Sequence, residues 1–297
     1  MDRNNARHMI TNHEHQTHLG KIEAYYDTAQ KYYEAVWGDG LHYGLWTEGI
    51  YTRSQAILNE NRILAEIAQV KPGELVLDAG CGVGASAEWL TEYTGACAVE
   101  FNITGSQLLI AQQRARKQMA DDALYCVQGD YHYLPFAAES FDVFWAQESI
   151  EHSDNVDLFI REAFRTLKPG GRAVIAGTFK GATEPTDRQR AQLATGMRAA
   201  GAFNDFRTAK ELATSMQGAG FAKIRLDDVT DCIMPSARQM RIMCQCGLPG
   251  AILGNRLSII SDIMVDNTTW GTYQEDLFAK GVTSYHIIRG EKIKSFN

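Results

Sequence analysis

The stretch that decides the fold of this chain is Val76-Leu77-Asp78-Ala79-Gly80-Cys81-Gly82-Val83-Gly84. The run at 74–77 is largely apolar and leads into an acid and three glycines at alternate positions, and residues 85–93 have the pattern of a helix. This order predicts a short buried strand, a tight turn and a helix N-terminus. Glycines at such a turn let the backbone approach a nucleotide-like ligand closely, because no Cβ stands in the way.

The chain downstream repeats an alternation of strands and helices. Strands are predicted at 74–79, 96–101, 123–127, 141–145, 172–178, 223–229 and 283–289, and helices at 85–93, 105–119, 156–167 and 208–218. Such alternation is typical of a parallel sheet with helices on both faces. We therefore predict an α/β fold with a Rossmann-like, mostly parallel sheet of seven strands.

Three regions fall outside this alternation. Residues 1–19 are expected to form a mobile tail, because the polar surroundings of its histidines build no rigid shell. Residues 20–70 are predicted to form a helical leader, or lid, ahead of the main domain at 71–297. Within that domain, segments 179–207 and 231–280 are expected to form a helical cap, since the second is too long for a turn and too apolar for a linker.

Composition excludes several classes of function. The 297 residues are 45% hydrophobic and have a net charge of −7, which argues against nucleic-acid partners and a basic membrane-binding face. No window is apolar enough for a membrane span, and the N-terminus lacks the apolar core of a secretory signal. Six cysteines without a disulfide pattern favour a cytoplasmic location. No pattern predicts a metal site, and the sequence is compatible with a homo-oligomer.

The glycine turn alone leaves two ligands open. Gly80-x-Gly82-x-x-Ala85 fits the relaxed dinucleotide pattern, and Glu100 lies at about the right distance to bind a ribose, which would indicate NAD. However, Asp78 would repel a pyrophosphate on this turn. An acid there suits a cationic ligand such as S-adenosylmethionine, which has an ammonium group and a sulfonium centre.

Motifs beyond the turn resemble the Rossmann-like (class I) methyltransferases. They are the turn itself as motif I, Val127-Gln128-Gly129-Asp130 with Leu134-Pro135-Phe136, Ser140-Phe141-Asp142-Val143 with Glu148-Ser149-Ile150-Glu151-His152, and Leu167-Lys168-Pro169-Gly170-Gly171. The resemblance implies S-adenosylmethionine as cofactor, with Asp130 on its adenine amino group. At the second strand, where the family usually has an acid, this chain has Asn102, which is similar to the tocopherol and sterol methyltransferase branches.

The leader narrows the resemblance. Its aromatic and glycine residues at 25–46 resemble those of tocopherol, sterol and sarcosine/dimethylglycine methyltransferases, in which tyrosines close over the methionine part of the cofactor. The residues expected to bind the cofactor are Asp78, Gly80, Cys81, Gly82, Asn102, Gln107, Gly129, Asp130, Tyr131, Gln147, Tyr25 and Tyr26. The aromatic residues expected to line the acceptor site are Trp37, Tyr43, Trp270 and Tyr273.

Candidates for a general base follow the fourth strand. Glu148 and His152 match a Glu-Ser-x-Glu-His segment of tocopherol-type enzymes, and Glu151 and His42 are further candidates. The alternative is that Glu151 and His152 cap the next helix or pair with its arginines.

We expect an S-adenosylmethionine-dependent methyltransferase that methylates carbon in a small hydrophobic molecule, such as an isoprenoid or a prenylated or aromatic natural product. The apolar, Met-rich segment 231–280 favours such an acceptor. Three alternatives stay open: N-methylation of a small amine or alkaloid, an NAD-dependent oxidoreductase, and a non-catalytic protein that binds the cofactor.

Overall fold

The computed structural model describes residues 3–36, 42–118 and 123–293. Its strands form one sheet of seven in the order β3-β2-β1-β4-β5-β7-β6. Their bounds are β1 Leu75–Ala79, β2 Cys97–Asn102, β3 Leu124–Gln128, β4 Phe141–Gln147, β5 Leu167–Lys180, β6 Phe221–Asp228 and β7 Thr283–Lys292. Only β7 runs antiparallel to its neighbours, β5 and β6. The predicted Rossmann-like fold is confirmed.

One strand begins earlier than expected. A strand was expected at 172–178, but β5 begins at Leu167 and so includes segment 168–171. Pairing with β4 shifts there, from Phe141 opposite Leu167 to Val143 opposite Arg172. Gly170 takes the left-handed backbone conformation, with φ of 87°, that lets the extra residues bulge out of the ladder.

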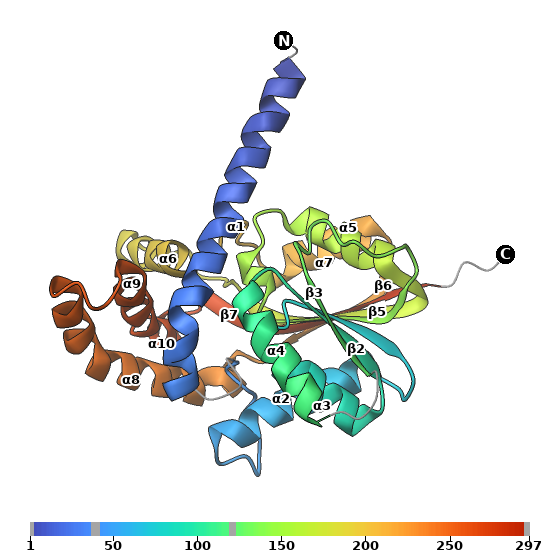
Figure 1. Cartoon of the computed structure of the whole chain (residues 1–297), viewed down its shortest axis with the longest axis horizontal. Coiled ribbons are helices and arrows are strands. Elements are labelled where there is room, and N and C mark those ends of the chain that lie inside the picture. The colour runs from blue at the N-terminus through green and yellow to red at the C-terminus, as the bar shows by residue number, and fades with distance from the viewer. Residues whose placement is uncertain (1–2, 37–41, 119–122, 294–297) are drawn as a thin grey trace.

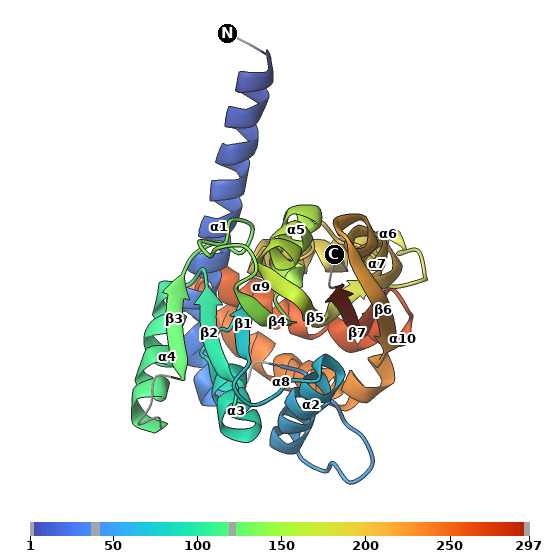
Figure 2. The same cartoon turned by 90° about the vertical axis from the view of Figure 1, so that its right-hand side faces the viewer.

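Helices cover both faces of the sheet (Figure 2). Their bounds are α2 Arg53–Ala68, α3 Ala85–Thr94, α4 Gly105–Gln118, α5 Val156–Thr166 and α7 Ala209–Ala219. Successive side chains of a strand point to opposite faces. In β4, Phe144 therefore packs into the core under α5 and α7, whereas Trp145 packs into the core under α2 and α3.

The leader and the cap pack against each other beside the sheet (Figure 1). The leader helix is α1 Arg3–Val36, and the cap helices are α6 Asp187–Ala200, α8 Thr230–Arg256, α9 Asp262–Gly271 and α10 Gln274–Ala279. Helix α1 contacts α4 as well as α6 and α9. A third hydrophobic cluster, which includes Tyr25, Phe203 and Met264, joins α1 to the cap.

The start of the chain, predicted to be a mobile tail, is helical, and its mobility stays a prediction. From Arg3 onward it is the first half of α1, which projects from the body in Figure 1. Two of its histidines contact the main domain: His15 bonds to Asp130 and Asp154, and His18 bonds to the backbone oxygen of His152. These contacts hold the helix against the open end of the sheet. None of the described helices is both long and apolar enough to cross a membrane, and all six cysteines, which lie within the described ranges, have free thiols.

Candidate active site

A single cavity lies at the carboxyl ends of β1, β2 and β4, where α/β sheets bind their ligands. One end is polar and is formed by the glycine turn, the end of β2 and the loop after β3. The other end is more apolar and is formed by α1 and the cap. Residues from segments far apart in the chain thus meet around one space, with Glu148 and Glu151 in its wall.

The glycines of the turn have two different roles. A Cβ on Gly80 would lie 2.4 Å from the Cβ of Ser149, and one on Gly84 would lie 2.2 Å from a carboxylate oxygen of Glu100. A Cβ on Gly82 would meet nothing closer than the Gln107 side chain at 4.0 Å. Gly80 and Gly84 therefore allow close packing, whereas Gly82 leaves room for a ligand.

Every residue expected to bind the cofactor lines this cavity except Asp78. Asp78 is buried, with 2% of its surface exposed, and its Oδ2 has no hydrogen-bond partner among the described residues. Burial and the nearby Glu100 raise the pKa of Asp78 well above its usual value. Glu100 is also outside the cavity wall and accepts a hydrogen bond from Cys126, so it does not hold a ribose as the dinucleotide hypothesis required.

Two amide side chains form the centre of the polar end. Asn102 donates to Gln107 at 2.9 Å, and Gln107 donates to Gln30 of α1 at 2.9 Å. Both Asn102 and Gln107 are buried and reach the cavity. Amide groups both donate and accept, so this pair suits the hydroxyl groups of a ribose.

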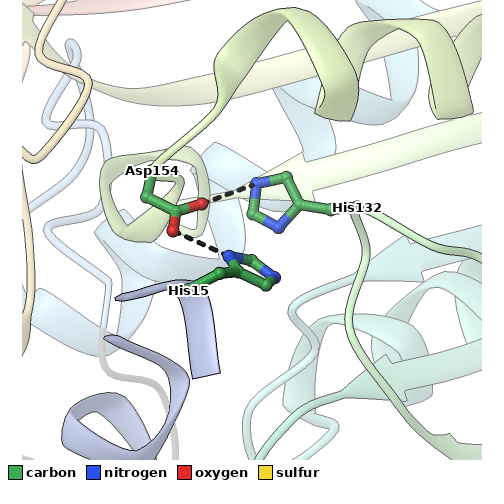
Figure 3. A group of neighbouring side chains, drawn as sticks. All are labelled: His15, His132 and Asp154. Atoms are coloured by element: carbon green, nitrogen blue, oxygen red, sulfur yellow. Dashed lines mark hydrogen bonds and ion pairs between the residues drawn. The ribbon is translucent and has the colours of Figure 1, made fainter. Parts of the chain in front are cut away.

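Asp130 is held by histidines on both of its oxygens. His132 donates to Oδ1 from its ring Nδ1 at 2.7 Å, and His15 lies 2.7 Å from Oδ2 through Nε2. The other nitrogen of His15 is 2.7 Å from Asp154 (Figure 3). An imidazole that donates to two carboxylates must have a proton on each nitrogen. Burial lowers the pKa of His15, but the hydrogen bonds to Asp154 and Asp130 raise it above its usual value overall.

The same histidines form a group of potential metal ligands. Atoms of His15, His132 and Asp154 lie within 4.8 Å of one another. Every ring nitrogen of the two histidines already has a hydrogen-bond partner, His132 Nε2 bonding to Ser153 at 2.8 Å. These bonds explain the grouping without an ion. They tie the leader to the loops after β3 and β4.

Glu148 follows β4 in a left-handed backbone conformation, with φ of 49°. Its Oε1 accepts hydrogen bonds from the backbone of Tyr43 at 2.8 Å and from the hydroxyl of Tyr285 at 3.0 Å. Burial, followed by repulsion from Glu60, raises the pKa of Glu148 well above its usual value.

Glu151 also lies in the wall and accepts a backbone hydrogen bond from Thr178 at 2.5 Å. Its Oε2 has no partner within the described ranges, and burial raises its pKa to about 7. The helix-capping alternative is not what the structure has: Asn155 caps α5, and Arg165 of that helix pairs with Glu162.

The two candidate histidines are kept neutral. Burial lowers the pKa of His152 to about 4 and that of His42 to about 4, with Arg53 also contributing to the second. His152 Nδ1 is 3.0 Å from the backbone oxygen of Ala200 and therefore donates to it, which leaves Nε2 to accept from Tyr26 at 2.9 Å.

The apolar end combines some expected residues with others that we did not predict. Tyr43 and Trp270 line the cavity, Tyr273 does not, and Trp37 lies outside the described residues. Gln274, the residue that follows Tyr273, lines the wall instead. The unpredicted residues of this end are Leu19, Ile22, Met240, Phe203 and Phe278. The spacing of 19, 22, 25, 26 and 29 is one face of a helix, and that signal could have identified the first two.

The charge of the wall is one-sided. Of the lining residues within 3–36, 42–118 and 123–293, none is Lys or Arg, while Asp130, Glu148 and Glu151 are acidic. None of the three arginines of α6 is among the lining residues, and two of them form ion pairs, Arg190 with Asp187 and Arg198 with Asp266.

Residues 77–175 match the family model of the methyltransferase domain. The chain contains a class I methyltransferase domain. The chain is 38% identical over 158 residues to the methyltransferase GfsG of Streptomyces halstedii, covering 52% of this chain and 57% of that protein. It is 30% identical over 210 residues to a sterol 24-C-methyltransferase of Aspergillus fumigatus, covering 70% of this chain and 55% of that protein.

Solved structures share this methyltransferase fold along most of the chain. The [4+2]-cyclase SpnF superposes with a TM-score of 0.74 and 23% identity, covering 92% of this chain and 96% of that one. A geranyl diphosphate methyltransferase in complex with geranyl diphosphate and sinefungin gives a TM-score of 0.70 and 18% identity, covering 93% and 100%. The chain spans about half the length of the curated relatives it matches. The resemblance expected from the motifs is confirmed, and the fold alone is compatible with more than one reaction.

Proposed function

We propose that this protein is an S-adenosylmethionine-dependent methyltransferase that methylates carbon in an uncharged, apolar acceptor of the isoprenoid or polyketide kind. The observation that supports this most directly is the two-ended cavity, polar at the glycine turn and aromatic at the cap, with carboxyl groups between the ends. The methyltransferase domain and the sterol C-methyltransferase relative support the same activity.

The polar end fits the proposed cofactor. Asn102 and Gln107 would bind the ribose hydroxyls, Asp130 the adenine amino group, and the space over Gly82 would admit the amino acid part. S-adenosylmethionine, when bound, supplies a methyl group on a sulfonium centre. The tyrosines of α1 close this end against water, because Tyr25 and Tyr26 are both part of its wall.

The apolar end fits an acceptor without charge. An anionic acceptor such as a prenyl diphosphate would find no Lys or Arg among the described lining residues to pair with its charge. Attack of an alkene on a methyl group leaves a positive charge on the acceptor. The rings of Tyr26, Phe203 and Trp270 can stabilise that charge through their faces.

A labelled-methyl assay tests the proposal. The protein is incubated with S-adenosylmethionine tritiated in its methyl group and, in separate reactions, a sterol with a side-chain double bond, a macrolactone, geranyl diphosphate with Mg²⁺, and sarcosine. We expect label in a neutral acceptor, and none with the Gly82→Val variant. Label in geranyl diphosphate or sarcosine alone would contradict the proposed acceptor class. Tight binding of S-adenosylhomocysteine without transfer would favour a non-catalytic or cyclase-like role.

A further inference from the structure

Behind the cavity wall lies a buried pair of carboxyl groups bridged by one tyrosine. The Tyr285 hydroxyl of β7 is 2.7 Å from Oε1 of Glu60 in α2 and 3.0 Å from Oε1 of Glu148. Glu60 and Tyr285 are fully buried, and the Glu148 side chain is 14% exposed. Only Glu148 reaches the cavity.

The number of protons in this group follows from its geometry. A tyrosine hydroxyl has one hydrogen and can donate it to one carboxylate at a time. Two oxygens at hydrogen-bond distance from that hydroxyl therefore require a second hydrogen, located on Glu60 or Glu148. Two like charges this close in a buried site cannot both persist, as in carboxyl pairs that share a proton.

We propose that Glu60 and Glu148 share one proton through Tyr285, and that Glu60 and Tyr285 thereby position a single negative charge on Glu148, the base that completes methyl transfer. This inference rests on the proposed function. Glu148 is the catalytic residue because it reaches the reacting molecule; Glu60 and Tyr285 act through it and are positioning residues.

The step balances as follows. A carbon–carbon bond forms to the methyl group as its bond to sulfur breaks, and the acceptor becomes a carbocation. Glu148 then removes a proton from the carbon next to the cationic centre, and the electron pair of that C–H bond closes a new double bond. For this step Glu60 holds the shared proton and donates to Tyr285, and Tyr285 donates to Glu148. Glu148 becomes neutral and returns its proton to water when the product leaves.

The surrounding groups are compatible with one negative charge. The backbone amide of Gly44 donates to Glu60 at 3.1 Å, and that of Tyr43 donates to Glu148. The side chain of Tyr43 donates to Gln274, so it does not compete for the pair.

Other titratable neighbours among the described residues are Arg53, whose charge interacts favourably with Glu148, and His42, which burial keeps neutral. Glu151 repels both carboxylates, and Tyr26, whose pKa burial raises, also faces Glu148. Burial raises the pKa of Glu60 to about 7, even though its hydrogen bonds lower it. The two carboxyl groups therefore titrate as a unit, and both hold their protons more tightly than an exposed glutamate does.

Infrared spectroscopy of the complex with S-adenosylhomocysteine tests the shared proton without any acceptor. The carbonyl band of protonated carboxyl groups is followed against pH. The spectrum of each variant is subtracted from that of the wild type, so that the band of Glu151, which both proteins contain, cancels. We expect a carboxyl that loses its proton between about pH 6 and pH 9 in the wild type. In Glu60→Gln and in Glu148→Gln the remaining carboxyl should titrate at least about one pH unit lower, because its like-charged partner is gone. A wild type whose difference bands titrate near the ordinary value for glutamate would overturn the proposal.

The pH profile of methyl transfer, with whichever acceptor is labelled in the assay above, tests the positioning roles. In Glu60→Gln a neutral amide takes the place of a group that is also neutral in the active form, so the rising limb, which reports the ionisation of Glu148, should stay in place. Tyr285→Phe removes a donor to the carboxylate, so the limb should move to higher pH. Glu66→Gln and Tyr51→Phe, at exposed positions, are the matched controls and should leave the limb in place. An unshifted limb in Tyr285→Phe, or an equal upward shift in Glu60→Gln, would reject these roles. If no acceptor is labelled, the proposed function has failed, and the infrared titration still decides the shared proton.

Discussion

The glycine turn offers a sharp contrast between two identical substitutions. In Gly80→Ala the new methyl group would lie 2.4 Å from Ser149 Cβ and 2.9 Å from its Oγ, at a φ of 96° that lies outside the left-handed minimum. In Gly82→Ala it would project into open space at a φ of 56°, which alanine can adopt at a cost of about 1 kcal/mol. Overpacking of a buried contact adds about 1–3 kcal/mol, so Gly80→Ala should lose about 3 kcal/mol of unfolding free energy in all.

Urea denaturation followed by circular dichroism measures these losses, and calorimetry with S-adenosylhomocysteine measures affinity. We expect Gly82→Ala to fold with a loss of about 1 kcal/mol yet bind the ligand at least about tenfold more weakly, because its methyl group occupies the ligand space. Equal stability losses in the two variants would refute the packing argument. Unchanged affinity in Gly82→Ala would mean that the ligand does not lie over this glycine.

Three further outcomes follow from the buried charges. A raised pKa means that folded Glu60 still binds a proton at a pH where the unfolded chain has lost it. The free energy of unfolding should therefore fall by about 3 kcal/mol from this group as pH rises from about 4.5 to about 7. Urea denaturation should show a shallower fall with pH in Glu60→Gln. The raised pKa of His15 means that its bonds to Asp130 and Asp154 stabilise α1 at low pH and weaken as pH rises through that pKa. The protection of the α1 amides relative to their intrinsic exchange rate at each pH should therefore fall with pH in the wild type and be low throughout in His15→Phe. Because Asp78 does not line the cavity, the affinity of Asp78→Asn for S-adenosylhomocysteine, measured by calorimetry, should be within a few-fold of the wild-type affinity. A loss of affinity of about a hundredfold would mean that Asp78 belongs to the cofactor site.

Much of the fold was predictable because its signals are local. Apolar runs of strand length, followed by helical periodicity, indicated each strand of the sheet, and the glycines of the turn lie at the cavity, as expected. The motif segments after β3 and β4 placed Asp130, Glu148 and Glu151 in the wall correctly, since residues at the carboxyl ends of neighbouring parallel strands meet at one edge.

What the sequence could not indicate depends on contacts between distant segments. Glu60 and Tyr285 are 225 positions apart, and no periodicity relates an acid on a leader helix to a tyrosine on an antiparallel strand. Tyr273 was predicted because aromatic rings suit an apolar wall, but at the start of α10 the next residue, Gln274, lines the cavity instead. His15 gave no signal because its two carboxylate partners come from separate loops.

The most direct test of the central claim is an NMR measurement on the product formed from S-adenosylmethionine labelled with ¹³C in its methyl group. The chemical shift and couplings of the transferred methyl group identify the atom to which it is bound. We predict a methyl group on carbon of a neutral isoprenoid or polyketide acceptor, with its formation greatly reduced in Glu148→Gln. A methyl group on nitrogen or oxygen, or an unaltered rate in Glu148→Gln, would contradict the account.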